Sequence, residues 1–447
     1  MITISDKHNC CGCSACAQAC PKQCISMLQD AEGFLYPQVD TSSCINCELC
    51  ERVCPVLNQY DERTVETLCA AINKDDIIRK ESSSGGVFTL LAEQIISKGG
   101  VVFGARFDDE WQVVIDSAET MEQVAAFRGS KYVQARVNDS FQRCRKYLDE
   151  GKNVLFSGTP CLISGLLHFL KKPYPNLVTV DFICHGVPSP EVWRRYLNEV
   201  IEAGSKAIRD INFRTKHDGW GKFSFFTNYI ESSNTIEMLS PTYKNPFMRA
   251  FISNVILRPS CFSCPAKNGR SNSDLTIADF WNIDKVSPGM YDDKGTSLII
   301  IHNDKGKKAI PFNQMMYEEE PVEALRYNPS YSVSPRIHHR RQEFFDSFLS
   351  DTNVHQLISY TLRPTFRQKI STLFWPYCKL KNLVKILLGR KVITQTKPNT
   401  GVVINSQTKK VFDSCACNLD QIVFRDKRNS WNSNYLRINI TIDNNSQ

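Results

Sequence analysis

The sequence predicts a mixed α/β (α+β) core, preceded by a small cysteine-rich domain and followed by a basic helical tail. Three observations lead to this fold class. Ten of the 19 cysteines lie within the first 58 of the 447 residues. Between about residues 68 and 302, short apolar runs alternate with amphipathic stretches, which is typical of strands and helices in an α/β domain. Between Asp351 and Asp413, eleven basic residues occur without one acidic residue.

The cysteine-rich segment carries two copies of the spacing C-x2-C-x2-C-x3-C-P. This is the spacing of bacterial ferredoxins, in which three cysteines of one run and the fourth of the other run bind each [4Fe-4S] cluster. A zinc site is the weaker alternative, because zinc sites pair two C-x2-C motifs. We therefore expect a ferredoxin-like dicluster domain at 1–58. Its clusters should be bound by two sets: Cys10, Cys13, Cys16 and Cys54, and Cys44, Cys47, Cys50 and Cys20.

The composition limits the compartment and the partners. Iron–sulfur ligation needs free thiolates, so we expect a reducing compartment rather than a disulfide framework. Residues 1–30 lack the pattern of a signal peptide, and no run approaches 18 apolar residues, so a cytoplasmic protein without a transmembrane helix is predicted. The eleven basic tail residues exceed the formal net charge of +7, so the rest of the chain is net negative. A nucleic-acid partner is therefore not expected.

The core elements follow from hydrophobic periodicity. Apolar residues at helical spacing predict three amphipathic helices, and short apolar runs predict six strands. The expected helices are 87–96, 162–170 and 191–201. The expected strands are 101–103, 153–157, 177–183, 223–230, 275–278 and 297–301.

The tail, 360–447, begins with a basic helical segment and ends in a polar stretch. Residues 363–391 pair eight Lys or Arg residues with aromatic and leucine-rich stretches, and Pro376 divides them. Such a segment fits two short helices lying on an anionic membrane surface. It equally fits a helical pair that packs on the preceding domain or docks to an acidic partner. Both interpretations remain open from the sequence.

The middle of the chain carries further motifs. They are Ser82–Gly86 (SSSGG), Phe127–Val133 (FRGSKYV), Ser157–Cys161 (SGTPC), Cys184–Ser189 (CHGVPS), Cys261–Cys264 (CFSC) and Asp274–Trp281 (DLTIADFW). In this order, after a dicluster module, the sequence resembles the family of coenzyme F-420 hydrogenase/dehydrogenase beta subunits. The resemblance implies an iron–sulfur flavoprotein that binds FAD and exchanges electrons with a hydride carrier, often a deazaflavin. It also implies that 68–150 and 151–345 are two parts of one flavin-binding domain. Ser14 and Glu48 depart from the pattern, since glycines are common at these places in cluster loops.

Small residues before predicted helices are the candidate flavin contacts, because a helix N-terminus with close backbone approach favours phosphate. Plain helix caps are the alternative. Lys131 would face the flavin or a phosphate, or is a solvated lysine. The candidate cofactor-binding residues are Ser84, Gly85, Gly86, Gly129, Ser130, Lys131, Gly158 and Thr159.

Four more cysteines could bind a third [4Fe-4S] cluster: Cys161, Cys184, Cys261 and Cys264. They could instead be small buried hydrophobic residues and an incidental C-x2-C pair. His185 is a candidate catalytic residue that would hydrogen-bond the cofactor or relay a proton, with a structural histidine as the alternative. The remaining cysteines are expected not to be ligands: Cys11, Cys24, Cys69, Cys144, Cys378, Cys415 and Cys417.

Two classes of function compete. The chain is either an oxidoreductase with its own substrate at the flavin or an electron-transfer subunit that feeds a partner dehydrogenase or hydrogenase. A flavin fits the first interpretation because it joins one-electron clusters to two-electron hydride carriers. The expected partners are a redox protein such as ferredoxin and a small-molecule or lipid-linked substrate. Polysaccharide biosynthesis is one setting for such a substrate.

Overall fold

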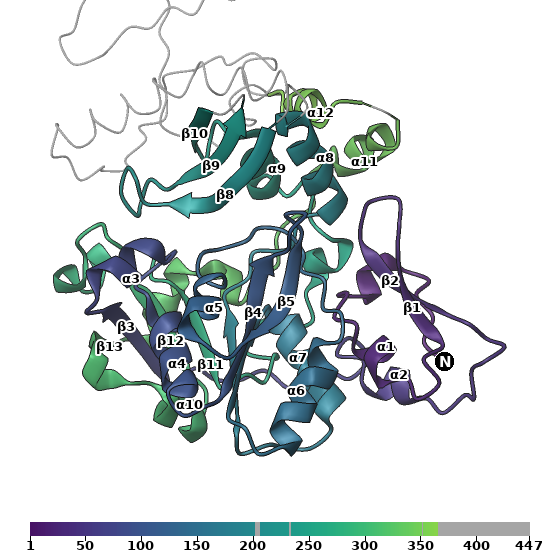
Figure 1. The fold of residues 1–447 in the computed structure, drawn as a ribbon, viewed down its shortest axis with the longest axis horizontal. Helices are drawn as coiled ribbons and strands as arrows, with labels where there is room; N and C mark the ends of the chain where they lie inside the picture. Colours follow the sequence, from purple (N-terminus) through teal and green to yellow (C-terminus); the bar gives the residue numbers. More distant parts are fainter. Residues whose placement is uncertain (202–205, 232–233, 351, 365–447) are drawn as a thin grey trace, which may run out of the picture. The chain divides into compact units, whose positions relative to one another are not determined.

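The computed structural model describes residues 1–364 except 202–205, 232–233 and 351 (Figure 1). Three sheets organise these residues: one of eight strands, one of three and one of two. The basic segment at 363–391 lies almost entirely outside the described residues, as does the polar stretch that follows it. Within the described residues, no helix is both long and apolar enough to cross a membrane.

The central sheet has the strand order β13-β3-β12-β11-β7-β6-β4-β5. Its inner strands β11, β7, β6 and β4 run parallel, and the remaining neighbours pair antiparallel. The sheet is therefore mixed, as predicted for an α/β core. Its strands in chain order are β3 (Thr67–Asn73), β4 (Val101–Phe107), β5 (Val113–Ala118), β6 (Val154–Gly158), β7 (Leu177–Phe182), β11 (Leu275–Asp279), β12 (Ser297–Ile301) and β13 (Met315–Glu320).

Both faces of this sheet are buried, which explains the continuous apolar runs of its inner strands. In β4, Val102 packs on one face, whereas Val101 and Phe103 pack on the other. The helices of the first face are α4 (Val87–Ile96), α5 (Met121–Ala125) and α10 (Asp304–Ala309). Those of the second face are α6 (Ser140–Asp149) and α7 (Pro160–Leu170). A further short helix, α3 (Asp76–Glu81), follows β3 (Figure 1).

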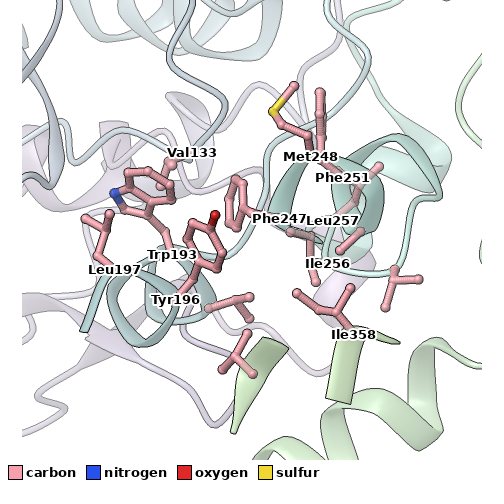
Figure 2. Packing of buried hydrophobic residues seen from close by; sticks show 14 of the residues in the cluster. Val133, Trp193, Tyr196, Leu197, Phe247, Met248, Phe251, Ile256, Leu257 and Ile358 are labelled. Atoms are coloured by element: carbon pink, nitrogen blue, oxygen red, sulfur yellow. The ribbon is translucent and has the colours of Figure 1, made fainter. Parts of the chain in front are cut away.

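A second layer is formed by the three-stranded sheet and four helices. The strands are β8 (Lys206–Thr215), β9 (Ser224–Glu231) and β10 (Asn234–Pro241), in the order β10-β9-β8. The helices are α8 (Pro190–Ile201), α9 (Pro246–Ile252), α11 (Arg341–Phe348) and α12 (Val354–Thr361). Trp193, Phe247 and Ile358 belong to one aromatic-rich core between these elements (Figure 2).

The N-terminal domain contains β1 (Ile25–Gln29), β2 (Leu35–Val39) and the short helices α1 (Ala15–Ala19) and α2 (Leu49–Arg52). Ser14 and Glu48 precede the two helices, and both have the left-handed backbone with φ 60°. Glycine adopts this conformation most readily, which explains why it is common at these two places. The domain packs on α7, where a Cβ at Gly165 would lie 2.8 Å from Cys13 Sγ. Only glycine permits this approach.

The remaining turns are 3-10 helices: η1 (Lys7–Asn9), η2 (Pro259–Ser263), η3 (Ile283–Lys285), η4 (Pro288–Met290), η5 (Phe312–Gln314), η6 (Val322–Tyr327) and η7 (Pro329–Tyr331). All nine expected core helices and strands are present, with ends shifted by a few residues. The expected helix at 162–170 begins earlier, at Pro160, because proline is well suited to the first helical turn. Strands β3, β5, β8, β10 and β13 were not among the expected elements.

Candidate functional site

The two ferredoxin runs fold so that each fourth cysteine lies with the other run. One small cavity is lined by Cys10, Cys13, Cys16 and Cys54, together with Cys11. A second is lined by Cys20, Cys44, Cys47 and Cys50, together with Cys24. These are the two predicted ligand sets. Burial raises the pKa of Cys16 to about 12, and the thiolates of Cys10 and Cys54 contribute to this rise. Such a thiol loses its proton to solvent only when a cation such as iron binds the sulfur and stabilises the thiolate.

Two cysteines that were expected not to be ligands, Cys24 and Cys11, lie close to the predicted ligands. The Sγ atoms of Cys24 and Cys20 are 3.4 Å apart. Hydrogen bonding to Cys13 and burial raise the pKa of Cys11, which packs in the same cluster as Cys161. No group of three or more His, Cys, Asp or Glu in the described residues could hold a metal ion. In a [4Fe-4S] cluster each of the four cysteines binds a different iron atom. The cysteines of such a site therefore lie farther apart than the ligands of a single metal ion.

The four further candidate ligands come from three elements and meet near the central sheet. Cys161 lies in the first turn of α7, Cys184 follows β7, and Cys261 and Cys264 lie in and just after η2. Burial raises the pKa of the Cys184 thiol, as do the nearby thiolates of Cys261, Cys161 and Cys264. The backbone NH of Val187 donates to Cys261 Sγ at 3.4 Å. The fold thus brings all four predicted cysteines together.

Two buried cations flank these four cysteines. Arg258 is fully buried and donates to the Cys10 carbonyl at 2.8 Å, while its Nη2 lies 3.5 Å from Cys10 Sγ. Lys267 is also buried and donates to the carbonyls of Cys184, at 2.8 Å, and Ser330. In the described part of the chain, neither side chain forms an ion pair with a carboxylate. A buried charge is costly unless it is compensated, so both cations indicate an anionic group at the cysteines.

A large cavity lies at the carboxyl ends of β4, β6, β7 and β11 and has a volume of about 630 Å³. Parallel α/β sheets build their ligand sites at this edge. Cys161 and Cys184 line the cavity, as do Cys11 and Cys13 of the first ferredoxin loop. The cavity therefore adjoins both the four-cysteine site and the dicluster domain.

Most of the predicted flavin contacts line this cavity, namely Ser84, Gly86, Gly129, Ser130, Lys131, Gly158 and Thr159. Gly85 does not. A Cβ there would lie 2.4 Å from the carbonyl oxygen of Ala71 in β3, and its NH donates to Ser297 Oγ at 3.0 Å. The position needs glycine because two strands approach it closely, so its role is in packing rather than in ligand contact.

The two loops that carry these residues are joined by serines. Ser83 Oγ accepts from the NH of Ser130 at 2.8 Å and lies 2.9 Å from its hydroxyl. Helices α4 and α7 both begin at the cavity, at Gly86 and Thr159, and neither has a side-chain cap. NH groups at such helix ends favour an anion such as a phosphate.

The side chain of Lys131 is half-buried and folds back onto its own loop. Its ammonium donates to the carbonyls of Ala126 and Arg128 at 2.8 Å each, and to that of Gly129 at 3.2 Å. Burial lowers the pKa of Lys131 to about 7. Its backbone bonds fix the 126–131 loop, and its side chain lines the cavity.

Comparison with known proteins agrees with this arrangement. Residues 9–58 match the 4Fe-4S dicluster domain. Residues 68–141 match the N-terminal part, and residues 151–324 the C-terminal part, of the coenzyme F420 hydrogenase/dehydrogenase beta subunit. The chain belongs to this family of beta subunits. The family resemblance predicted from the motifs is therefore confirmed, and the N-terminal segment is a 4Fe-4S dicluster domain.

Two relatives illustrate the family. The chain is 26% identical over 167 residues to a subunit of the F(420)H(2) dehydrogenase of Methanosarcina mazei. This match covers 34% of the chain and 46% of the relative, so the chain spans about half the length of that protein. A chain of the F420-reducing [NiFe] hydrogenase complex from Methanosarcina barkeri shares 17% identity, with 67% of this chain and 93% of that chain covered and a TM-score of 0.38.

His185 lines the cavity of this beta-subunit-like domain with a defined tautomer. The Nδ2 group of Asn254 donates to the Arg336 carbonyl at 3.0 Å, so its Oδ1 must accept. That oxygen lies 2.6 Å from His185 Nε2, which therefore carries the proton. Burial lowers the pKa of His185. The imidazole is neutral near pH 7, and its Nδ1 is the nitrogen able to accept a hydrogen bond.

Sequence reasoning missed three charged residues near these sites: Arg214, Arg258 and Lys267. None stands in a motif with recognisable ligand spacing. Arg258 offered one usable signal, because it lies three residues before Cys261 in a segment that already held a predicted ligand pair. Arg214 and Lys267 become notable only through their burial, which depends on the tertiary fold.

Proposed function

We propose that the chain is an iron–sulfur flavoprotein oxidoreductase that exchanges electrons between its dicluster domain and an organic hydride carrier bound in the large cavity. One observation carries the proposal: Cys11 of the first ferredoxin loop and Cys161 of the four-cysteine site pack in one cluster, and both line the large cavity. Three sites suited to redox groups are thus adjacent. In this proposal a third [4Fe-4S] cluster is bound by Cys161, Cys184, Cys261 and Cys264.

The residues around the cavity fit FAD. Its volume of about 630 Å³ lies within the usual range of about 300–1,000 Å³ for cofactor sites. Two helix N-termini without side-chain caps, those of α4 and α7, would receive the pyrophosphate. In α7 the Cys161 NH is the candidate donor, because Pro160 has no NH and the Leu162 NH donates to the Thr159 carbonyl. Small residues at Gly86 and Gly158 let a ligand approach the backbone there. Lys131, whose side chain lines the cavity, would lie near the negative parts of such a cofactor.

Bound clusters would supply one-electron transfer, and a flavin would supply the step between one-electron and hydride chemistry. The chain itself provides position and shielding. Helix α7 positions Cys161, and η2 positions Cys261, at the four-cysteine site. His185 offers a neutral Nδ1 that can accept a proton or a hydrogen bond from a molecule in the cavity.

Anaerobic purification followed by metal and flavin analysis tests this proposal. We expect about twelve irons and about one FAD per chain. A chain that binds its full iron but no flavin in any preparation would contradict the flavoprotein assignment. Turnover is then measured with reduced viologen as electron donor and a deazaflavin coenzyme as hydride acceptor.

An electron-transfer subunit is the second candidate, favoured by the relative from Methanosarcina mazei, which is one subunit of a dehydrogenase. Such a subunit would bind the same clusters but would turn over no substrate without its partner. A substrate from polysaccharide biosynthesis belongs to the first candidate, and assays with nucleotide-activated sugars extend the same experiment.

Replacing Thr159 by aspartate should expel the flavin while leaving the clusters in place. Aspartate is a favourable helix cap, so α7 should keep its stability, but its carboxylate would repel a pyrophosphate at the same helix end. We expect the dissociation constant for FAD to rise at least about tenfold, as charge-assisted contacts are lost. The measurement is FAD titration of deflavinated protein.

Thr159→Asn is the matched control, because asparagine caps equally well and carries no charge. Its FAD affinity should stay near that of the wild type, and both variants should keep their iron. Equal FAD affinity in the aspartate and asparagine variants would show that the pyrophosphate does not bind at this helix end.

A further inference from the structure

Arg214 is a buried arginine at the end of β8 and forms part of the wall of the large cavity. Its side chain is 3% exposed. One nitrogen, Nη1, donates to the Asp279 carboxylate. The guanidinium also lies over two aromatic rings, 4.2 Å from the centre of Phe223 and 5.3 Å from that of Trp281. These contacts fix the orientation of the guanidinium before any ligand arrives.

Two nitrogens of Arg214, Nε and Nη2, have no hydrogen-bond partner among the described residues. A buried charged donor without a partner is costly, and native proteins leave few of them. The two nitrogens lie on the same edge of the guanidinium. That edge binds both oxygens of a carboxylate or phosphate in bidentate fashion. Because Asp279 accepts only from Nη1, no hydrogen bond among the described residues occupies this edge, and the Tyr132 hydroxyl lies near enough to share a ligand with it.

The arginine remains charged despite its burial. Burial opposes the charge, but the adjacent Asp279 carboxylate outweighs it and the pKa of Arg214 is raised. The hydroxyl of Tyr132, which also lines the cavity, lies beside the guanidinium. A permanent cation with an open edge is thus present at this corner of the cavity.

Asn328 adds an acceptor to the same cavity. It is 4% exposed, and its Nδ2 donates to the Asp279 carbonyl at 2.8 Å, which fixes the orientation of the amide. Its Oδ1 is buried and has no partner in the described residues. The ring of Trp281 stacks on Trp220 with centroids 5.2 Å apart and forms a flat wall beside these groups.

We propose that Arg214 and Asn328 form an oxyanion subsite of the cavity. Arg214 binds a carboxylate or a phosphate, and Asn328 accepts a hydrogen bond from a hydroxyl or NH group of the same molecule. The proposal rests on the proposed function for the role of the cavity. It adds the class of ligand, which is an anionic molecule with a hydrogen-bond donor next to its anionic group. The oxyanion comes either from the phosphates of the flavin or from a second, anionic substrate.

Calorimetric titration with inorganic phosphate tests the subsite without requiring the substrate. The full chain is prepared anaerobically with its clusters and titrated both without FAD and after FAD loading. We expect Arg214→Gln to weaken phosphate binding at least about tenfold, because two charge-assisted hydrogen bonds are lost. If phosphate binds only the flavin-free chain, the subsite binds a phosphate of the flavin. Phosphate that also binds the loaded chain assigns it to a second ligand.

Trp220→Phe is the matched control. Trp220 Nε1 donates to the other oxygen of Asp279 at 2.8 Å, yet Trp220 lies outside the cavity lining. If Arg214→Gln acted only by disturbing Asp279, this variant would weaken phosphate binding as well. Arg214→Lys, which keeps the charge but lacks the bidentate edge, should also bind phosphate more weakly, and it serves if the glutamine variant does not fold.

The subsite is disproved if the wild-type chain binds no phosphate, or if wild type and both Arg214 variants bind it equally. These results are independent of flavin content, which is measured separately by absorbance. A chain that never binds FAD but loses phosphate affinity in Arg214→Gln would contradict the flavoprotein assignment and keep the oxyanion subsite.

Discussion

Replacing Cys261 and Cys264 together by alanine should remove about four irons from a chain that holds about twelve. Both residues are half-buried, and desolvation raises the pKa of Cys261 to about 12 and that of Cys264 to about 11. Neutral thiols of this kind could persist without metal, so the iron count decides between a cluster and a packing role. Alanine is preferred to serine because it cannot ligate iron. Iron analysis and the EPR spectrum of the reduced protein provide the two readouts.

Cys69→Ala with Cys144→Ala is the matched control for this experiment. Both thiols are buried, at 1% and 0% exposure, and line neither the two ferredoxin cavities nor the large cavity. The control removes the same number of sulfurs and should keep all of the iron. Should the Cys261 and Cys264 variant retain its full iron and an unchanged spectrum, the four-cysteine site is structural, and the proposed third cluster is wrong.

The dicluster domain could be predicted from the sequence because its ligands lie at a characteristic spacing within two short segments. Three ligands per cluster lie on one short loop, so the spacing alone identifies them. Even the exchange of the fourth cysteine, Cys20 and Cys54, follows from this geometry. The structure groups the two sets as expected. The spacing within each loop was therefore sufficient to predict which cysteines lie together.

The surroundings of the sites could not be predicted, because they depend on contacts between residues far apart in the chain. Cys11 was expected not to be a ligand, and no sequence pattern predicted that the packing of the first loop on α7 would place it in one cluster with Cys161. Gly85 stands in a motif that favours phosphate binding, whereas its neighbours in space are two strands. Strands such as β8 lack a clear period, so Arg214 had no sequence signal that placed it in the cavity.

Arg258 should raise the reduction potentials of two clusters. One is bound by Cys10, Cys13, Cys16 and Cys54, and the other is the cluster proposed at the four-cysteine site. The Arg258 guanidinium contacts Cys10 through the backbone carbonyl and Sγ. The pKa of Cys161 is raised by hydrogen bonding to Cys11 and by burial, and that of Cys261 by burial, and the Arg258 charge offsets part of each rise. Its other NH groups donate to Gln134 Oε1 and to the Leu35 carbonyl, at 2.9 Å each, so no carboxylate neutralises it in the described residues. A cluster gains negative charge on reduction, and a nearby cation therefore favours the reduced state.

Arg258→Gln should make these clusters harder to reduce. With an effective dielectric constant of about 20 and separations of several ångströms, one charge contributes about 2 kcal/mol, which corresponds to a shift on the order of 100 mV to more negative potential. EPR-monitored redox titration of the full chain measures this shift. The cluster of Cys44, Cys47, Cys50 and Cys20 provides an internal reference, since none of its cysteines contacts Arg258 in the described hydrogen bonds.

Two further variants separate charge from packing at Arg258. Arg258→Lys keeps the charge and should restore most of the potential, although it cannot make all four contacts. Arg79→Gln removes another buried arginine, one paired with Asp292 and outside the three cysteine-lined cavities, and should leave every potential unchanged. If Arg258→Gln and Arg258→Lys shift the potentials equally, the arginine acts through the shape of the loop. The cation would then be a packing element, and the charge at the four-cysteine site would be balanced by Lys267.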